Sequence, residues 1–172
     1  EIEMIAPSHG LIWRDHIGDI VSLYKKWASS ECDKKGVVVY DTMWGSTQKI
    51  AYMIKRVMEK AGIQVLLQDI KDDHISDIMT EIINAKYICV GSPTLNNGIM
   101  PTIASFLAYM KGLAPKNRTG LAFGSYGWGG QSVGEIEGIL GQAGFNMLDS
   151  VKIQYVPDDD ELDVAAKNLQ RQ

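Results

Sequence analysis

The feature that most constrains the fold of this chain is a fivefold alternation of short apolar runs with segments of helical periodicity. The first run, Gly36–Asp41, is continuous and β-branched, as in a strand that is buried on both faces. Strands that alternate with helices form parallel sheets, because each crossover packs back onto the sheet with the same hand. The sequence therefore predicts an α/β fold, with a five-stranded, doubly wound parallel sheet and helices on both faces.

Local signals predict where the elements lie. The strands are expected at Gly36–Asp41, Ile63–Asp69, Tyr87–Gly91, Thr119–Gly124 and within Phe145–Val156. The helices are expected to begin near Ser46, behind a cap at Asp73, at Pro101, at a capping box of Ser132 and Glu135, and behind the acidic cluster Asp158–Glu161. Glycines expected to lie just past helix ends are Gly62, Gly112 and Gly144. Ligands of such sheets bind outside the carboxyl ends of the strands, so function is expected in the loops after strands one, three and four.

The segment before Gly36 does not share this pattern. An apolar stripe that starts at Trp13 and ends near Ala28 predicts a helix, and Ser29–Lys35 has the composition of a polar linker. We therefore divide the chain into residues 1–35, the end of another domain plus a linker helix, and residues 36–172, the α/β domain.

Composition excludes several classes of protein. The chain has 172 residues and a net charge of −4, without a cluster of Lys and Arg that could neutralise nucleic acid. No apolar run approaches the roughly 18 residues of a membrane-spanning helix. Cys32 and Cys89 lack the spacing of a metal site or a disulfide framework and are expected to be free thiols. We expect a soluble, cytoplasmic protein that binds neither nucleic acid nor a membrane.

The first loop, Asp41–Gln48 (loop one), has the composition of a phosphate cradle. A helix N-terminus offers unpaired N–H groups, to which Thr42, Ser46 and Thr47 add hydroxyl donors, while Gly45 permits a tight turn. The loop contains no Lys or Arg, so it is not a Walker A loop and suits a phosphate monoester held by neutral donors. The alternative is that these hydroxyls merely cap the helix.

Two further loops suit a flat ligand. Gly91–Gly98 (loop three) is polar and rich in turn residues, and Gly124–Gly130 (loop four) places Tyr126 and Trp128 among glycines. Exposed aromatic side chains at the carboxyl end of a strand favour a planar ligand, although a surface turn with incidental aromatics is the alternative. Together, the three loops predict a site for a phosphorylated, planar heterocycle.

At this point the sequence resembles the flavodoxin-like family, whose FMN phosphate loop has the pattern Thr-x-x-Gly-x-Thr, here Thr42, Gly45 and Thr47. The strings YDTMWGST, GSPTLNNG and GSYGWGG, with the opening APSHGLIWR, narrow the resemblance to the C-terminal flavin domain of flavodiiron proteins, also called A-type flavoproteins. In that family a metallo-β-lactamase-like diiron domain comes first, so residues 1–35 would be its tail plus a linker helix, and Glu1 would mark a cut rather than a natural start.

The resemblance implies FMN as the cofactor and three groups of contacts. The residues that match the family's binding loops are Thr42, Met43, Trp44, Gly45, Ser46 and Thr47 around the phosphate, Pro93, Thr94, Leu95, Asn96 and Asn97 along the ring, and Ser125, Tyr126, Gly127, Trp128, Gly129 and Gly130 on its other side. Gly98 is the position at which we expect a peptide bond to turn when the flavin is reduced.

The resemblance also implies a role without catalytic residues in this chain. The domain would pass electrons from a flavin reductase or rubredoxin to the diiron site of a complete, homodimeric enzyme that reduces O₂ or NO. His9 resembles a diiron ligand of that complete protein, but the other ligands would lie upstream of Glu1, so we expect no metal in this chain.

Two other functions remain open. A freestanding FMN-dependent NAD(P)H:quinone oxidoreductase also uses a flavodoxin-like fold, and it needs an open stacking site for nicotinamide. A receiver-like regulatory domain needs an acidic cluster with a Lys at the strand ends, for which Asp41 alone is insufficient.

Overall fold

The computed structural model of the protein describes residues 2–172, which divide into two compact units, the residues up to Glu31 and Cys32–Gln172. The first unit contains one helix, α1 (Ile17–Ala28). The second contains the strands β1 (Asp33–Tyr40), β2 (Gln64–Asp69), β3 (Ala85–Gly91), β4 (Thr119–Tyr126), β5 (Asn146–Met147) and β6 (Val151–Gln154). Its helices are α2 (Ser46–Lys60), α3 (Ile75–Ile82), α4 (Pro101–Leu113), α5 (Gln131–Gln142) and α6 (Asp159–Leu169).

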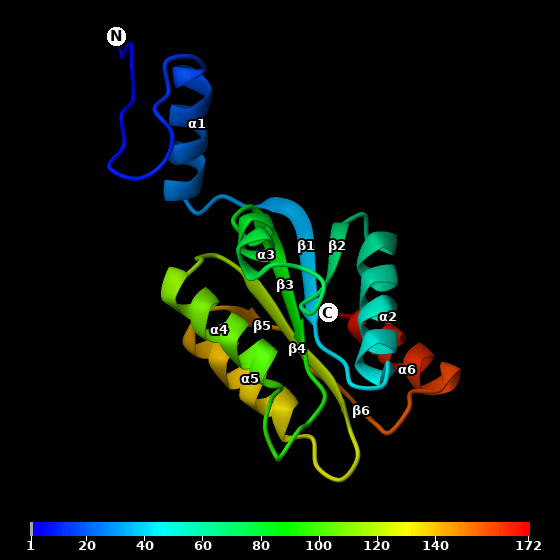
Figure 1. The fold of residues 1–172 in the computed structure, drawn as a ribbon. Coiled ribbons are helices and arrows are strands. Elements are labelled where there is room, and N and C mark those ends of the chain that lie inside the picture. The colour runs from blue at the N-terminus through cyan, green and yellow to red at the C-terminus, as the bar shows by residue number, and fades with distance from the viewer. Residues whose placement is uncertain (1) are drawn as a thin grey trace. The chain divides into compact units, whose positions relative to one another are not determined.

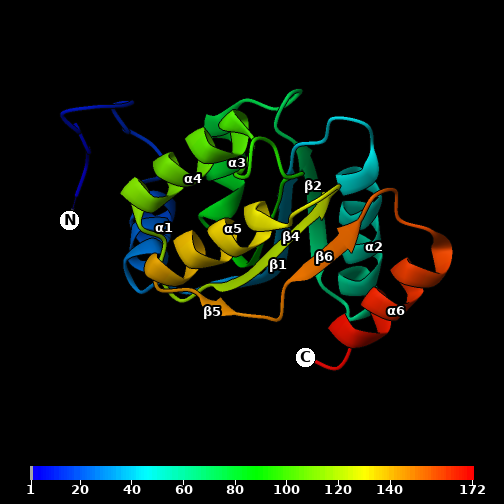
Figure 2. The same cartoon turned by 90° about the horizontal axis from the view of Figure 1, so that it is seen from below.

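The second unit is the predicted doubly wound sheet. Its strands are all parallel and lie in the order β2-β1-β3-β4-β5, with β6 also paired to β4. Helices α3, α4 and α5 cover one face, and α2 and α6 cover the other (Figure 1), as the view from below confirms (Figure 2). The strand order reverses between β1 and β3, which places the predicted binding edge at their carboxyl ends.

Two apolar cores hold the sheet between its helices. Val37 and Val39 of β1 face the helices α3, α4 and α5, whereas Val38 and Tyr40 face α2 and α6. Successive strand side chains point to opposite faces, so a strand covered on both sides must be apolar throughout. The continuous apolar run at the end of β1, Val37–Tyr40, is therefore explained by burial on both faces.

The expected fifth strand is divided into two. β5 pairs with the start of β4, and β6 pairs with its end, from Phe123↔Val151 to Tyr126↔Gln154. Residues 148–150 between them leave the ladder. The prediction of five strands is thus correct in topology, because β5 and β6 together occupy the single edge position beside β4.

The helix ends differ from the predictions in three places. α5 begins behind Gly130 without a side-chain cap, so the predicted capping box of Ser132 and Glu135 is wrong. The cap of α3 is His74, whose ring nitrogen accepts a hydrogen bond from the Ser76 N–H, rather than Asp73. α4 runs through Gly112 and ends in a left-handed Ala114. The other predicted helix ends agree with the structure: α2 begins at Ser46, α4 begins at Pro101, and Gly62 and Gly144 have positive φ past helix ends. The last helix begins within the acidic cluster, where Asp158 and Glu161 form a capping box that was not predicted.

The first unit pairs an extended segment with a helix. Trp13 lies outside α1, in an isolated antiparallel bridge to Ile5, so its placement in the predicted helix is wrong. The helix starts only after His16, whose backbone is left-handed. Likewise, the predicted linker is shorter than expected, because β1 already begins at Asp33 and bonds to the Asn84 carbonyl. No helix within residues 2–172 is long and apolar enough to cross a bilayer.

Candidate site at the carboxyl ends of β1, β3 and β4

Loops one, three and four meet at one edge of the sheet. The Asp41 N–H donates to the Gly91 carbonyl at 3.2 Å, and the Thr94 N–H donates to the Ser125 carbonyl at 3.0 Å. The hydroxyls of Thr47 and Ser125, both buried, lie 2.9 Å apart. These bonds join the three loops into one surface, as expected for the ends of adjacent parallel strands.

The helix that follows loop one opens with unpaired donors. Gly45, with φ +85°, precedes α2, and no side chain caps this helix. The Thr42 hydroxyl accepts from the Gly45 N–H at 2.9 Å and therefore shapes the loop itself. Among the described residues, the N–H groups at positions 46–48 find no acceptor. The structure thus contradicts the simple capping alternative and leaves three N–H groups and a helix dipole for an anion.

Loop one is not free of cations, although its own sequence contains none. The Lys71 ammonium, from the turn after β2, lies 3.0 Å from Asp41 Oδ1 and donates to the Thr42 carbonyl. The ammonium contacts Asp41 and Thr42 and is not itself shown as a phosphate donor, so a cradle of neutral donors stays a prediction. Lys71 contacts loop one although it is distant from it along the chain, so no local pattern could select it.

Loop three contains a tight turn that is closed by its own backbone hydrogen bonds. Leu95 and Gly98 exchange two backbone hydrogen bonds, and Asn96 and Asn97 between them have φ of 49° and 61°. Asn tolerates this left-handed conformation better than most residues. Both asparagines are exposed at the tip of the turn. The predicted peptide rotation at Gly98 stays a prediction.

The base of loop three is bonded to α5. The Thr94 hydroxyl lies 2.8 Å from the Ser132 hydroxyl, which also contacts the Ser92 carbonyl at 3.2 Å. Glu135 accepts from the Ile99 N–H at 3.2 Å. These contacts explain why Ser132 and Glu135 do not cap their own helix. Their side chains hold loop three instead.

The two tryptophans of the site are almost entirely uncovered. Trp44 is 92% exposed and Trp128 is 98% exposed, while Met43 beside Trp44 is 42% exposed. Tyr126 is half-buried at the end of β4, with the Lys152 ammonium 6.0 Å from its ring centre. A large aromatic surface that nothing covers, next to unpaired N–H groups, fits a flat ligand that carries an anionic group.

The other predicted contact residues fall into two groups, one accessible at the surface and one buried beneath it. The half-buried or exposed positions are Gly45, Ser46, Thr94, Leu95, Asn96, Asn97, Gly127, Gly129 and Gly130. Those buried beneath them are Thr42, Thr47, Pro93 and Ser125. The buried group shapes the loops through internal hydrogen bonds, as Thr47 and Ser125 show.

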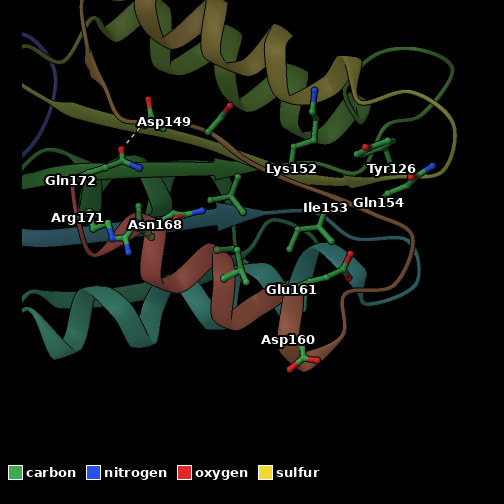
Figure 3. Close-up of a pocket in the computed structure, with 15 residues that line it drawn as sticks. Tyr126, Asp149, Lys152, Ile153, Gln154, Asp160, Glu161, Asn168, Arg171 and Gln172 are labelled. Carbon is green, nitrogen blue, oxygen red and sulfur yellow. Dashed lines mark hydrogen bonds between the residues drawn. The ribbon is translucent and has the colours of Figure 1, made fainter.

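A separate cavity of about 920 Å³ lies between β6 and α6 (Figure 3). The Asp149 N–H donates to the Gln172 side chain at 2.7 Å across one end of it. Tyr126 is the only residue that this cavity shares with the predicted binding loops. Its lining mixes acidic and basic side chains and presents no cluster that resembles the edge at loop one.

The structure describes His9 as an exposed side chain in the first unit. Within residues 2–172, no group of three or more His, Cys, Asp or Glu side chains is arranged to hold a metal ion. A diiron site would therefore need ligands that these residues do not supply.

Comparison with known proteins identifies related sequences and folds. The profile of the flavodoxin family matches residues 38–168. The chain is 41% identical to the rubredoxin-oxygen oxidoreductase of Megalodesulfovibrio gigas, over 98% of this chain and 44% of that protein. It is 40% identical to the nitric oxide reductase of Moorella thermoacetica, over 94% of this chain and 41% of that protein.

Solved structures give the same result. The flavodiiron protein of Giardia intestinalis superimposes with a TM-score of 0.92 at 28% identity, covering 99% of this chain and 43% of that one. The chain therefore spans less than half the length of these three relatives. The similarity extends through the first unit and is not confined to the α/β unit.

Proposed function

Because this chain belongs to the flavodoxin family, we propose that it is the FMN-binding, electron-transfer domain of a flavodiiron-type reductase. FMN is the cofactor that the family membership and the flavodiiron homologues imply. Bound FMN supplies one- and two-electron redox chemistry, and the protein supplies binding, orientation and electrostatics.

The residues of the site fit this cofactor. The N–H groups at positions 46–48 have no acceptor, and the helix dipole of α2 favours an anion at the same place. These groups would hold the phosphate. Trp44 and Trp128 would border the ring, together with the exposed turn at Asn96 and Asn97.

One observation carries the proposal more than any other. The N-terminus of α2 is uncapped at the same edge of the sheet at which two tryptophans are more than nine-tenths exposed. An uncapped helix end offers N–H donors to an anion, and bare aromatic rings offer apolar surface, so a phosphorylated flat ring would suit both.

The parent activity is part of the proposal. The similarity to oxygen and nitric oxide reductases supports a complete protein that reduces O₂ or NO at a diiron site, for which residues 2–172 do not supply a full set of ligands. Rubredoxin is the donor that the name of one relative suggests, and a flavin reductase is the alternative. We propose that the complete protein is a homodimer, which would bring the flavin of one subunit near the diiron site of the other.

An absorbance scan of the purified chain, with cofactor identification by mass and iron analysis, tests the first part of the proposal. We expect flavin bands, FMN as the released molecule and no stoichiometric iron. A colourless chain that does not take up added FMN would refute FMN binding.

Reduction kinetics distinguish the electron-transfer domain from a freestanding quinone oxidoreductase. In a stopped-flow experiment, reduced rubredoxin should bleach the flavin rapidly, and NADPH alone should not. Rapid direct reduction by NADPH, with turnover of a quinone, would favour the oxidoreductase instead.

A further inference from the structure

Loop one, which contains the proposed phosphate position, also contains a buried negative charge. Asp41 is 1% exposed, and it immediately precedes the loop's first hydroxyl residue. One carboxylate oxygen accepts from the Thr42 N–H at 2.6 Å, and the other accepts from the Thr102 hydroxyl of α4. The carboxylate is thus fixed in place by neighbours on two elements.

A second charge compensates for it from outside the loop. The Lys71 ammonium lies 3.0 Å from Asp41 Oδ1 and also donates to the Thr42 carbonyl. Its position is set by the turn after β2, where the Lys71 N–H donates to Asp69 Oδ1 at 3.1 Å. Lys71 is 48% exposed, so the ammonium lies between the buried carboxylate and the solvent.

A phosphate monoester carries up to two negative charges, and a bare carboxylate next to its site would repel it. Like charges repel each other more strongly at a partly buried site than in bulk water, because the effective dielectric is lower there. A flavin without a phosphate experiences no such repulsion. The charge state of the pair therefore matters for FMN and not for riboflavin.

We propose that Lys71 is a specificity-determining residue of the site: by neutralising Asp41, it lets loop one accept a phosphorylated flavin. The inference rests on the proposed FMN function. It assigns Lys71 to electrostatic compensation of Asp41, and not to a direct hydrogen bond with the phosphate.

Calorimetric titration of the apoprotein with FMN and with riboflavin tests this role. In Lys71→Met, the affinity for FMN should fall roughly tenfold, while the affinity for riboflavin changes by less than about twofold. In the double variant Asp41→Asn/Lys71→Met, both charges are absent, and the affinity for FMN should return to within about threefold of the wild-type value. Lys111→Met, in the last turn of α4, removes one positive charge elsewhere and should leave both affinities unchanged.

The possible outcomes are distinct. If FMN and riboflavin weaken equally in Lys71→Met, Lys71 merely supports the fold of the loop, and the inference is wrong. If the double variant binds FMN as weakly as Lys71→Met, the ammonium acts on the phosphate directly, and the inference is again wrong. A wild-type chain that binds no FMN overturns the proposed function itself, which is a different result from either.

Discussion

Thr47 and Ser125 each place a hydroxyl group in the interior, and each is the other's hydrogen-bond partner. Their oxygens lie 2.9 Å apart, and Thr47 is fully buried. Thr47→Val keeps the shape and leaves the Ser125 hydroxyl unsatisfied, so we expect a loss of about 1–2 kcal/mol in the free energy of unfolding. Urea unfolding measures the loss.

A second variant separates this effect from simple packing. In Thr47→Val/Ser125→Ala, both polar partners are gone, and part of the lost stability should return. Thr80→Val, whose hydroxyl bonds only its own helix on the surface, should change stability little. Strictly additive losses in the double variant would show that the two hydroxyls do not depend on each other.

The thiol of Cys89 gives the fold a pH dependence in the alkaline range. Burial raises the pKa of the Cys89 thiol from 9.0 to about 12. The unfolded chain loses this proton above pH 9 while the folded chain keeps it, so the free energy of unfolding should fall by about 1.4 kcal/mol per pH unit between those values. Below pH 9 the thiol has no such effect. Unfolding curves across this range should show a shallower decline for Cys89→Ala than for wild type.

Lys71 makes a contact in the site that the sequence alone does not indicate. The pattern of loop one indicated unpaired N–H groups at the start of a helix, because these belong to consecutive residues, and the structure has them. The role of the loop's hydroxyls as phosphate donors stays a prediction. Asp41 and Lys71 follow the ends of β1 and β2, and the parallel pairing of these two strands brings them together. Charge compensation across a sheet has no local signature.

At the level of elements, β4 and loop three approach so closely that a side chain at Gly124 has no room. A Cβ added there would lie 2.1 Å from the Ser92 carbonyl oxygen. Gly124→Ala should therefore push loop three away, at a cost of about 3 kcal/mol in stability, and should weaken FMN binding. Thermal unfolding and flavin titration measure the two effects.

The matched control for this variant is Gly138→Ala in α5. Nothing lies within 4 Å of the position of its added Cβ, and the residue is exposed in the helix interior. Alanine should stabilise the helix there by up to about 1 kcal/mol. An equally stable Gly124→Ala protein would show that loop three can move without cost.

The elements that could be predicted are those whose signal is local. Continuous apolar runs predicted β1, β3 and β4, because a strand that is buried on both faces needs apolar side chains at successive positions. The absence of a Ser132 cap at the start of α5 could not be predicted, because the Ser132 hydroxyl donates to the carbonyl of Ser92, which is distant in the sequence. The division of the last strand follows from the departure of residues 148–150 from the edge of the sheet, where the alternation of apolar and polar residues gave no boundary.

For the whole molecule, the two units make separable predictions. All three binding loops belong to Cys32–Gln172, and none belongs to the first unit. A chain without residues 1–31 should therefore fold and bind FMN with an affinity within about twofold of the full chain. Titration of both proteins, with circular dichroism as the control for folding, is the measurement. A truncated chain that folds but loses the flavin would assign part of the site to the first unit.

The exposure of Trp44 and Trp128 makes their fluorescence a measure of flavin binding. Both indoles meet water on nearly every side, whereas the remaining two tryptophans, Trp13 and Trp27, belong to the other unit. Indole emission overlaps the absorption of an isoalloxazine, so a ring bound against these two residues would quench their fluorescence. Replacing Trp13 and Trp27 by Phe would leave a chain whose remaining tryptophan fluorescence reports directly the fraction of molecules that carry the cofactor.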